Sequence, residues 1–73
     1  MTLSLCDEPV FSQVFREYSE SLYRFLYYKT GDQVLAQDLT QEAFMRMWKN
    51  CEGVSFETAK GYAFTTAKNL VFG

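Results

Sequence analysis

Two short breaks divide this sequence into three stretches with helical periodicity, and they constrain the fold more than any other feature. Thr30-Gly31-Asp32 can end one helix and cap the next, and a glycine interrupts the pattern again within residues 51–56. A single proline and four glycines leave long uninterrupted segments elsewhere. The sequence therefore predicts an all-α fold, a compact bundle of three main helices running from residue 9 to about 29, from 33 to about 50, and from about 57 onwards.

The first helical segment carries one apolar stripe, about 100° wide, which we predict to face the core. Its members are Phe11, Val14, Phe15, Tyr18, Leu22, Phe25 and Leu26. Three further tyrosines, Tyr23, Tyr27 and Tyr28, fall outside the stripe, where they either cover a neighbouring element or stay half-exposed.

The second and third segments also have an apolar side that predicts core packing. In the second it consists of Leu35, Ala36, Leu39, Ala43, Phe44 and Met47; in the third, of Ala59, Tyr62, Ala63, Thr66, Ala67 and Leu70. Alanines at four-residue spacing favour a close approach of the third helix to its neighbours. Phe64 lies at the margin, as an edge core residue or as an exposed ring available for base stacking. Because apolar residues continue to the end of the chain, we expect the third helix to be truncated relative to a longer parent protein.

Two helix faces are polar and point away from the predicted core. Asp38, Gln41, Glu42, Met45 and Lys49 share an arc centred about 160° from the core side of the second helix. Thr65, Lys68 and Asn69 lie opposite the core side of the third helix. Such arcs are typical of solvated surface, and the pattern alone leaves a binding surface as the alternative.

Charge and residue types exclude several classes of function. The net charge of −2 argues against a general nucleic-acid-coating protein. The charge is uneven, because residues 1–55 carry five basic and eight acidic groups, whereas residues 56–73 carry two basic groups and one acidic group, so DNA contact is expected near the C-terminal end. The sequence has no histidine, no Cys-x-x-Cys motif and no phosphate-binding glycine loop. We therefore predict no enzyme activity, no metal site and no cofactor.

The two cysteines and the N-terminus bear on cellular location. The first residues have neither a basic region nor an apolar core typical of a signal peptide, and Leu5 is too large for a lipoprotein cleavage site before Cys6. We predict a cytoplasmic protein without membrane insertion. Cys6 and Cys51 are expected to be reduced thiols without a function, since disulfides are rare in that compartment.

The segment Asp38-Leu-Thr-Gln-Glu-Ala-Phe-Met-Arg-Met-Trp48 resembles the second conserved segment of region 2 in bacterial sigma factors. Phe11–Gly31 resembles the first segment of that region, and Ala59–Leu70 resembles the third segment leading into the fourth. The order and the short spacing are similar to those of the extracytoplasmic-function (ECF) class. The resemblance implies a region 2 domain over residues 9–73, after a lead-in of residues 1–8, without the second domain that reads the minus-thirty-five element.

The resemblance also implies partners and site residues for transcription initiation. Asp38, Gln41 and Glu42 match residues that dock on the clamp helices of the RNA polymerase β′ subunit in the family. We predict that this surface extends to Met45, Arg46 and Lys49. The loop 52–56 and the following helix match the part that captures a flipped base of the non-template strand of the minus-ten promoter element and holds the separated strand. The predicted DNA-binding residues are Lys60, Thr65, Lys68 and Asn69.

The interpretation includes a regulatory partner, and one alternative function stays open. The family implies an anti-sigma factor that covers region 2 and holds it inactive. The alternative function is a helical protein-interaction module, in which the acidic face of the second helix binds another partner and the third helix never contacts DNA.

Overall fold

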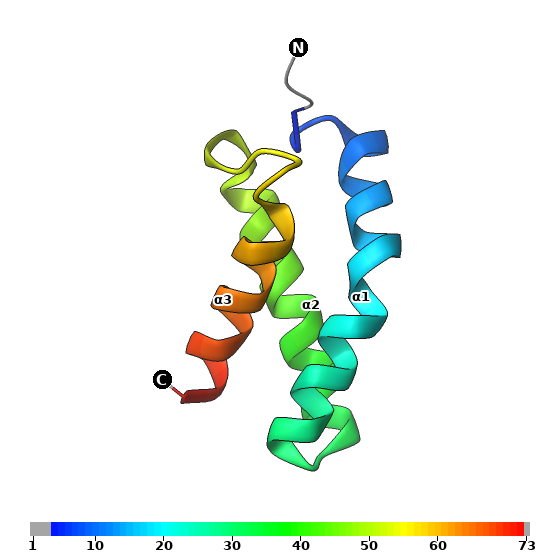
Figure 1. Cartoon of the computed structure of the whole chain (residues 1–73), viewed down its shortest axis with the longest axis vertical. Coiled ribbons are helices and arrows are strands. Elements are labelled where there is room, and N and C mark those ends of the chain that lie inside the picture. Colours follow the sequence, from blue (N-terminus) through cyan, green and yellow to red (C-terminus); the bar gives the residue numbers. More distant parts are fainter. Residues whose placement is uncertain (1–3, 73) are drawn as a thin grey trace.

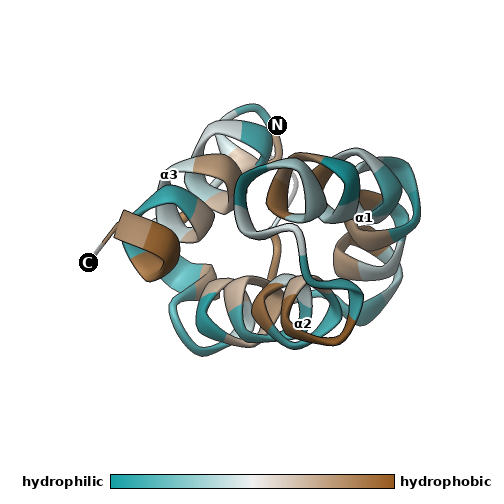
Figure 2. Ribbon diagram, turned by 90° about the horizontal axis from the view of Figure 1, so that it is seen from below, coloured by the Kyte–Doolittle hydropathy of each residue, from teal (hydrophilic) through white to brown (hydrophobic). Residues whose placement is uncertain are grey.

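Three helices form a bundle in the computed structural model, which describes residues 4–72 (Figure 1). They are α1 (Glu8–Thr30), α2 (Gln33–Lys49) and α3 (Ala59–Phe72), and a short 3-10 helix, η1 (Cys51–Gly53), lies between α2 and α3. Each helix contacts the other two, and the view along the bundle shows them around a common centre (Figure 2). The predicted all-α fold of three main helices is confirmed.

The connection between α1 and α2 is short because specific residues end one helix and begin the next. Gly31 has a φ of 69°, a left-handed conformation that favours glycine, and its N–H donates to the Tyr27 carbonyl at 2.7 Å. Asp32 caps α2, since its Oδ1 accepts from the Leu35 N–H at 3.1 Å. The chain therefore reverses direction, and α1 and α2 pack antiparallel (Figure 1).

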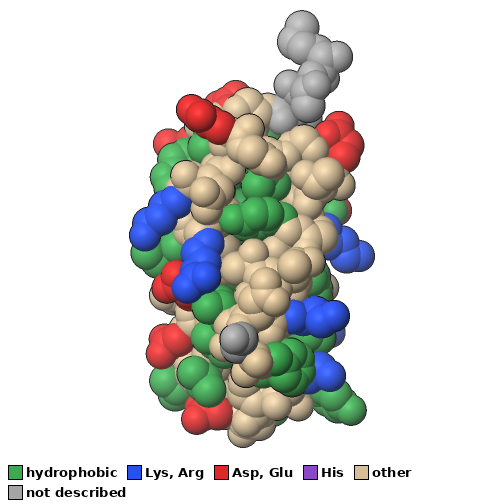
Figure 3. Space-filling model, turned by 90° about the vertical axis from the view of Figure 1, so that its left-hand side faces the viewer, with side chains coloured by type: hydrophobic (Ala, Val, Ile, Leu, Met, Phe, Trp, Pro, Cys, Tyr) green, Lys and Arg blue, Asp and Glu red, His purple; other side chains and the backbone are tan. Residues whose placement is uncertain are grey.

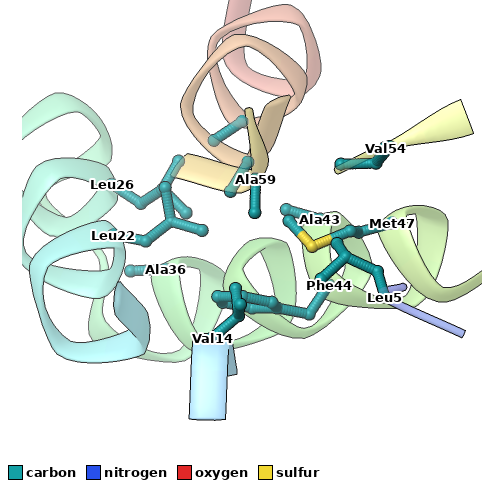
Figure 4. Packing of buried hydrophobic residues seen from close by; sticks show 12 residues of the cluster. Leu5, Val14, Leu22, Leu26, Ala36, Ala43, Phe44, Met47, Val54 and Ala59 are labelled. Carbon is teal, nitrogen blue, oxygen red and sulfur yellow. The ribbon is translucent and has the colours of Figure 1, made fainter. Parts of the chain in front are cut away.

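The core draws residues from all three helices and from the segments near the N-terminus and η1. Figure 4 shows Leu22 and Leu26 of α1, Phe44 and Met47 of α2, and Ala59 of α3 converging. The fully or almost fully buried apolar residues are Leu5, Val14, Leu22, Leu26, Ala36, Ala43, Phe44, Met47, Val54, Ala59, Ala63 and Ala67. Members of all three apolar sides predicted from periodicity thus face the core.

Two residues predicted to be core are exposed instead. Phe15 is 40% exposed and Leu35 is 44% exposed. Phe15 packs edge-on against Phe44, with ring centroids 4.9 Å apart, and faces an opening between α1 and α2 that no α3 residue lines. Leu35 lies in the first turn of α2, in the part of the α1–α2 pair that extends past the end of α3, so no third helix covers it (Figure 1). Buried Thr40 was not among the predicted core residues, and its hydroxyl donates to the Ala36 carbonyl at 2.7 Å.

Alanine allows α3 to approach the other helices closely. Ala59, Ala63 and Ala67 have no exposed surface. Half-buried Phe64 packs against Phe25 with ring centroids 5.6 Å apart, which makes it an edge core residue. The close approach leaves no space at the interface for larger side chains.

A disulfide joins Cys6 to Cys51, which corrects the expectation of two reduced thiols. The segment before α1 folds back against η1, where Leu5 is fully buried and Ser4 forms an isolated antiparallel bridge with Ser55. This fold-back brings the two Cα atoms within 5.1 Å although 45 residues separate them in the sequence. Periodicity within helices gives no information on such a contact, because it depends on how a non-helical segment packs.

Reduction of this disulfide should lower the free energy of unfolding by about 2–4 kcal/mol. A cross-link between residues 45 positions apart removes about 4 kcal/mol of chain entropy from the unfolded state. Urea titrations of the oxidised and reduced protein, followed by circular dichroism, measure the difference. The Cys6→Ser, Cys51→Ser variant is the control and should unfold at one midpoint with or without reductant. Equal midpoints for the oxidised and reduced native chain would contradict the cross-link.

Ala63→Leu should destabilise the bundle by about 1–3 kcal/mol, because the added side chain must enter the closely packed α3 interface. Gly61→Ala is the matched control on the same helix. Gly61 is exposed and a Cβ there meets nothing within 4 Å, so this change should stabilise by about 0.5–1 kcal/mol through helix propensity. Thermal melts test both; an Ala63→Leu melting temperature at or above that of the native chain argues against the close approach.

Candidate functional site

The exposed face of α2 contains all six residues predicted to bind a polymerase. Asp38, Gln41, Met45, Arg46 and Lys49 are exposed and Glu42 is half-buried. At about 100° per residue they fall within one continuous arc of about 140°, so the helix presents them side by side. The structure thus brings this predicted set together on one surface, which we call the α2 face.

Charge is graded along the α2 face. Acidic Asp38 and Glu42 precede basic Arg46 and Lys49 along the helix. The Arg46 Nε lies 3.0 Å from the Glu42 Oε2, and both side chains are about half-exposed. Such an exposed pair contributes little to stability and can open at low cost when a partner offers a competing charge. Asp38 forms no ion pair within residues 4–72 and is available to a basic group of a partner.

An apolar groove adjoins the α2 face and runs between α1 and α2. Its volume is about 510 Å³, and its wall includes Phe11, Phe15, Phe44 and Trp48. The groove also borders on three residues of the α2 face, namely Gln41, Met45 and Lys49. The Phe11 and Trp48 rings meet edge-on at a centroid distance of 5.0 Å, which holds the wall in place. The α2 face and this groove therefore form one continuous surface with a polar part and an apolar part.

The sequence did not assign the aromatic groove residues to a site. Phe15 was placed in the core, and Trp48 was part of the motif without a role. Trp48 is 44% exposed and Met45 is 52% exposed, which is unusual for two large apolar side chains three residues apart on one helix. Met45 was already among the predicted binding residues, whereas periodicity gave no signal for Trp48, because a ring at the margin of the core stripe can be covered by a neighbour or left exposed.

The α3 residues predicted to bind DNA separate into two groups. Thr65, Lys68 and Asn69 are exposed and lie on one arc of about 100°, opposite the buried alanines. Lys60 lies two turns earlier and is turned towards α1, where its Nζ is 6.0 Å from the centroid of the Tyr18 ring. The structure therefore brings together three of the four residues and leaves Lys60 apart.

The described residues form no continuous basic patch on the side of the molecule on which α3 lies. Figure 3 shows separate Lys and Arg side chains there, with hydrophobic and uncharged polar atoms between them. A surface of this kind neutralises few phosphates, so hydrogen bonding and shape would have to contribute to any nucleic-acid contact.

The loop between α2 and α3 is ordered by local hydrogen bonds. The Ser55 N–H donates to the Thr58 Oγ1 at 3.1 Å, and the Thr58 N–H donates to the Ser55 Oγ at 3.3 Å. Asn50 connects the end of α2 to α3, since its Nδ2 donates to the Tyr62 hydroxyl at 3.3 Å. A pocket of about 430 Å³ opens in this loop, which we call the loop pocket. It is lined by Ser4, Cys51, Glu52, Gly53, Val54, Ser55 and Thr58.

Metal-binding groups do not gather in the described part of the chain. Across residues 4–72, no three Asp, Glu or Cys side chains come together in a way that would hold a metal ion. Over the same range, no helix is both long enough and apolar enough to span a bilayer. The described surfaces offer hydrogen bonds, charge and apolar area, which are the means of binding macromolecules.

The fold and these surfaces define a helical domain with an outward polar face on α2, an adjoining apolar groove and a separate ordered loop. The sequence model of the sigma-70 region 2 family matches residues 14–72. The chain belongs to this family, and the resemblance inferred from its motifs is confirmed.

Curated relatives of the chain are ECF RNA polymerase sigma factors. It is 32% identical over 67 residues to BldN of Streptomyces coelicolor, covering 89% of this chain and 25% of the relative. It is 35% identical over 57 residues to SigM of Bacillus subtilis, covering 78% and 35%, and 31% identical over 62 residues to SigE of Mycolicibacterium smegmatis, covering 85% and 24%. The chain thus spans about a quarter to a third of the length of these relatives. No solved structure matches it.

Proposed function

We propose that this domain docks on the core RNA polymerase through the α2 face and engages the non-template strand of the minus-ten promoter element through the loop pocket and α3. The observation that carries the proposal is the exposed α2 face, where the residues that match the family's docking motif lie together beside an apolar groove.

Docking would combine charge with apolar burial. Asp38 and Glu42 would accept hydrogen bonds from basic groups of the β′ clamp helices, and Arg46 and Lys49 would meet acidic groups further along. The half-exposed rings of Phe15 and Trp48 offer apolar area that a partner helix can cover. Charge would then set the orientation, while the groove supplies much of the affinity.

DNA contact would use the other side of the bundle. An unstacked base can enter the loop pocket, while Lys68 neutralises a phosphate and Thr65 or Asn69 donates a hydrogen bond to a base or to the backbone. Lys60, which is turned towards Tyr18, would contact the strand separately. Since the α2 face and the α3 residues belong to different helices, the proposal assigns polymerase and single-stranded DNA to separate surfaces of one domain.

The wider setting is part of the same proposal. The domain would act in the cytoplasm, where polymerase and promoter are found, and a regulator of the anti-sigma type would compete for the α2 face. Residues 9–73 would form the region 2 unit, and recognition of the minus-thirty-five element would need a further domain. Docking and strand capture are the two steps that the chain itself would contribute.

The Gln41→Ala, Glu42→Lys variant should lose at least about tenfold in affinity for the isolated β′ clamp helices, because a hydrogen bond is removed and a charge is reversed. The matched control is Gln13→Ala, Glu17→Lys on the exposed outer face of α1, which makes the same chemical changes and should bind like the native chain. Calorimetry measures both affinities, and circular dichroism verifies the helix content.

Two outcomes would count against docking. A folded native chain that does not bind the clamp helices would favour the alternative of an interaction module with another partner. Equal losses in the α2 and α1 variants would show that net charge, rather than the α2 face, governs the interaction.

Single strands selected from a randomised pool should bind more tightly than scrambled strands of the same composition. Lys68→Ala, Asn69→Ala should weaken that binding by about tenfold and reduce the slope of log affinity against log salt by about 0.7. Gln13→Ala, Arg24→Ala on the outer face of α1 removes one amide and one cation as a control. Fluorescence anisotropy at several salt concentrations gives both quantities; identical binding of selected and scrambled strands would exclude sequence-dependent capture.

A further inference from the structure

The loop pocket is built from two parts of the chain that are distant in sequence. Residues 51–55 and Thr58 form most of its lining, and Ser4 completes the wall from the segment before α1. Ser4 is joined to the loop by an antiparallel bridge with Ser55. The shape of the pocket therefore depends on whether the N-terminal segment stays against the loop.

The Cys6–Cys51 disulfide holds the N-terminal segment at this position. Cys6 lies two residues from Ser4, and Cys51 is itself part of the pocket lining. Leu5, which lies between Ser4 and Cys6 in the sequence, is fully buried, and the Cys6 N–H donates to the Ser4 Oγ at 3.2 Å. The covalent bond thus fixes the one wall of the pocket that does not come from the α2–α3 connection.

Neither cysteine residue is fully buried. Cys6 is exposed and Cys51 is half-buried. The function proposed above places the domain in a compartment where disulfides between accessible cysteines are conditional rather than permanent. An accessible disulfide that shapes a binding pocket in such a compartment connects pocket geometry to the thiol–disulfide balance.

We propose that Cys6 and Cys51 form a redox-controlled positioning device for the loop pocket, in which the oxidised form holds Ser4 in the wall and binds single-stranded DNA more tightly. This inference rests on the proposed function, since it assigns the pocket to a nucleic-acid base. Reduction lets residues 4–6 leave the loop, so the pocket loses a wall and must be ordered again at each binding event. The α2 face does not line the pocket, and polymerase docking is therefore independent of the redox state.

The redox-controlled positioning device operates by thiol–disulfide exchange with a small-molecule disulfide such as oxidised glutathione. The Cys6 thiolate attacks one sulfur of the oxidant, which forms a mixed disulfide and releases one thiolate. The Cys51 thiolate then attacks the Cys6 sulfur, which forms the protein disulfide and releases the second thiolate. Two protein thiols lose two electrons and two protons in total, and one oxidant molecule becomes two thiols. A dithiol reductant reverses the reaction.

The test compares oxidised and reduced protein in two assays at 10 °C, with helix content monitored by circular dichroism. Selected single strands should bind the oxidised form about fivefold to tenfold more tightly than the reduced form. Isolated β′ clamp helices should bind both forms equally. The Cys6→Ser, Cys51→Ser variant should match the reduced form and show no response to oxidant. A purely stabilising disulfide in a fully folded protein would instead leave the single-strand affinities of the oxidised and reduced forms equal.

A second variant keeps the test decisive if the reduced protein unfolds. Ser4→Gly retains both cysteines and removes the side chain that Ser4 contributes to the pocket wall, so the oxidised variant should bind single strands as weakly as the reduced form predicted above. Ser4 is exposed, which makes the substitution tolerable for the fold. Hydrogen exchange of the Val54 and Ser55 amides, which donate to the Cys51 carbonyl and the Thr58 hydroxyl, should be slower in the oxidised form.

The outcomes separate this inference from the proposed function. Equal single-strand affinity of the oxidised native chain, the Ser4→Gly variant and the double serine variant overturns the redox device and leaves the DNA-binding role intact. No binding of selected strands by any form, with clamp binding preserved, overturns the DNA-binding role and the redox device together. A redox effect of the same size on clamp binding overturns the device as a local control of the loop.

Discussion

The antiparallel pairing of α1 and α2 is the contact on which both candidate surfaces depend. The left-handed Gly31 and the Asp32 cap allow the chain to reverse within two residues, so the two helices lie against each other over most of their length. This pairing creates the apolar groove and turns the α2 face outwards. It also gives α3 a surface of two helices on which its alanines can pack closely. A longer connection would leave the relative position of the helices to side-chain packing alone.

Much of the fold could be predicted from the sequence because helical periodicity is a local property. The three helices begin and end within about two residues of the predicted positions, and the alanines of α3 are buried as expected. Periodicity identifies the inward side of a helix, but it does not say where the neighbouring helix ends. Leu35 is exposed for that reason, and Phe15 is exposed because it faces the groove between α1 and α2, which no α3 residue lines. The Cys6–Cys51 contact depends on the path of non-helical segments, which no periodic pattern describes.

The candidate site likewise contains residues that local helical spacing predicts and residues that only tertiary contacts bring together. Helical spacing was sufficient to expect Asp38, Gln41 and Lys49 on an outward face, whereas their assignment to polymerase binding came from the family resemblance. The groove could not be predicted, since a tryptophan at the margin of a core stripe has the same periodicity whether a neighbour covers it or not. The participation of Ser4 in the loop pocket was equally hidden, because it arises from a tertiary contact between distant segments.

The apolar groove also lowers the stability of the unbound domain. Rings that lie half-exposed between α1 and α2 contribute less to the core than the high aromatic content of the chain would suggest. A partner that covers the groove binds only the folded state, and it therefore raises the stability of the domain by mass action. Copies without a partner unfold more often and are cleaved more readily by proteases that act on open chains. Occupancy of the groove would thus determine the lifetime of the domain, and its abundance would follow the supply of the partner.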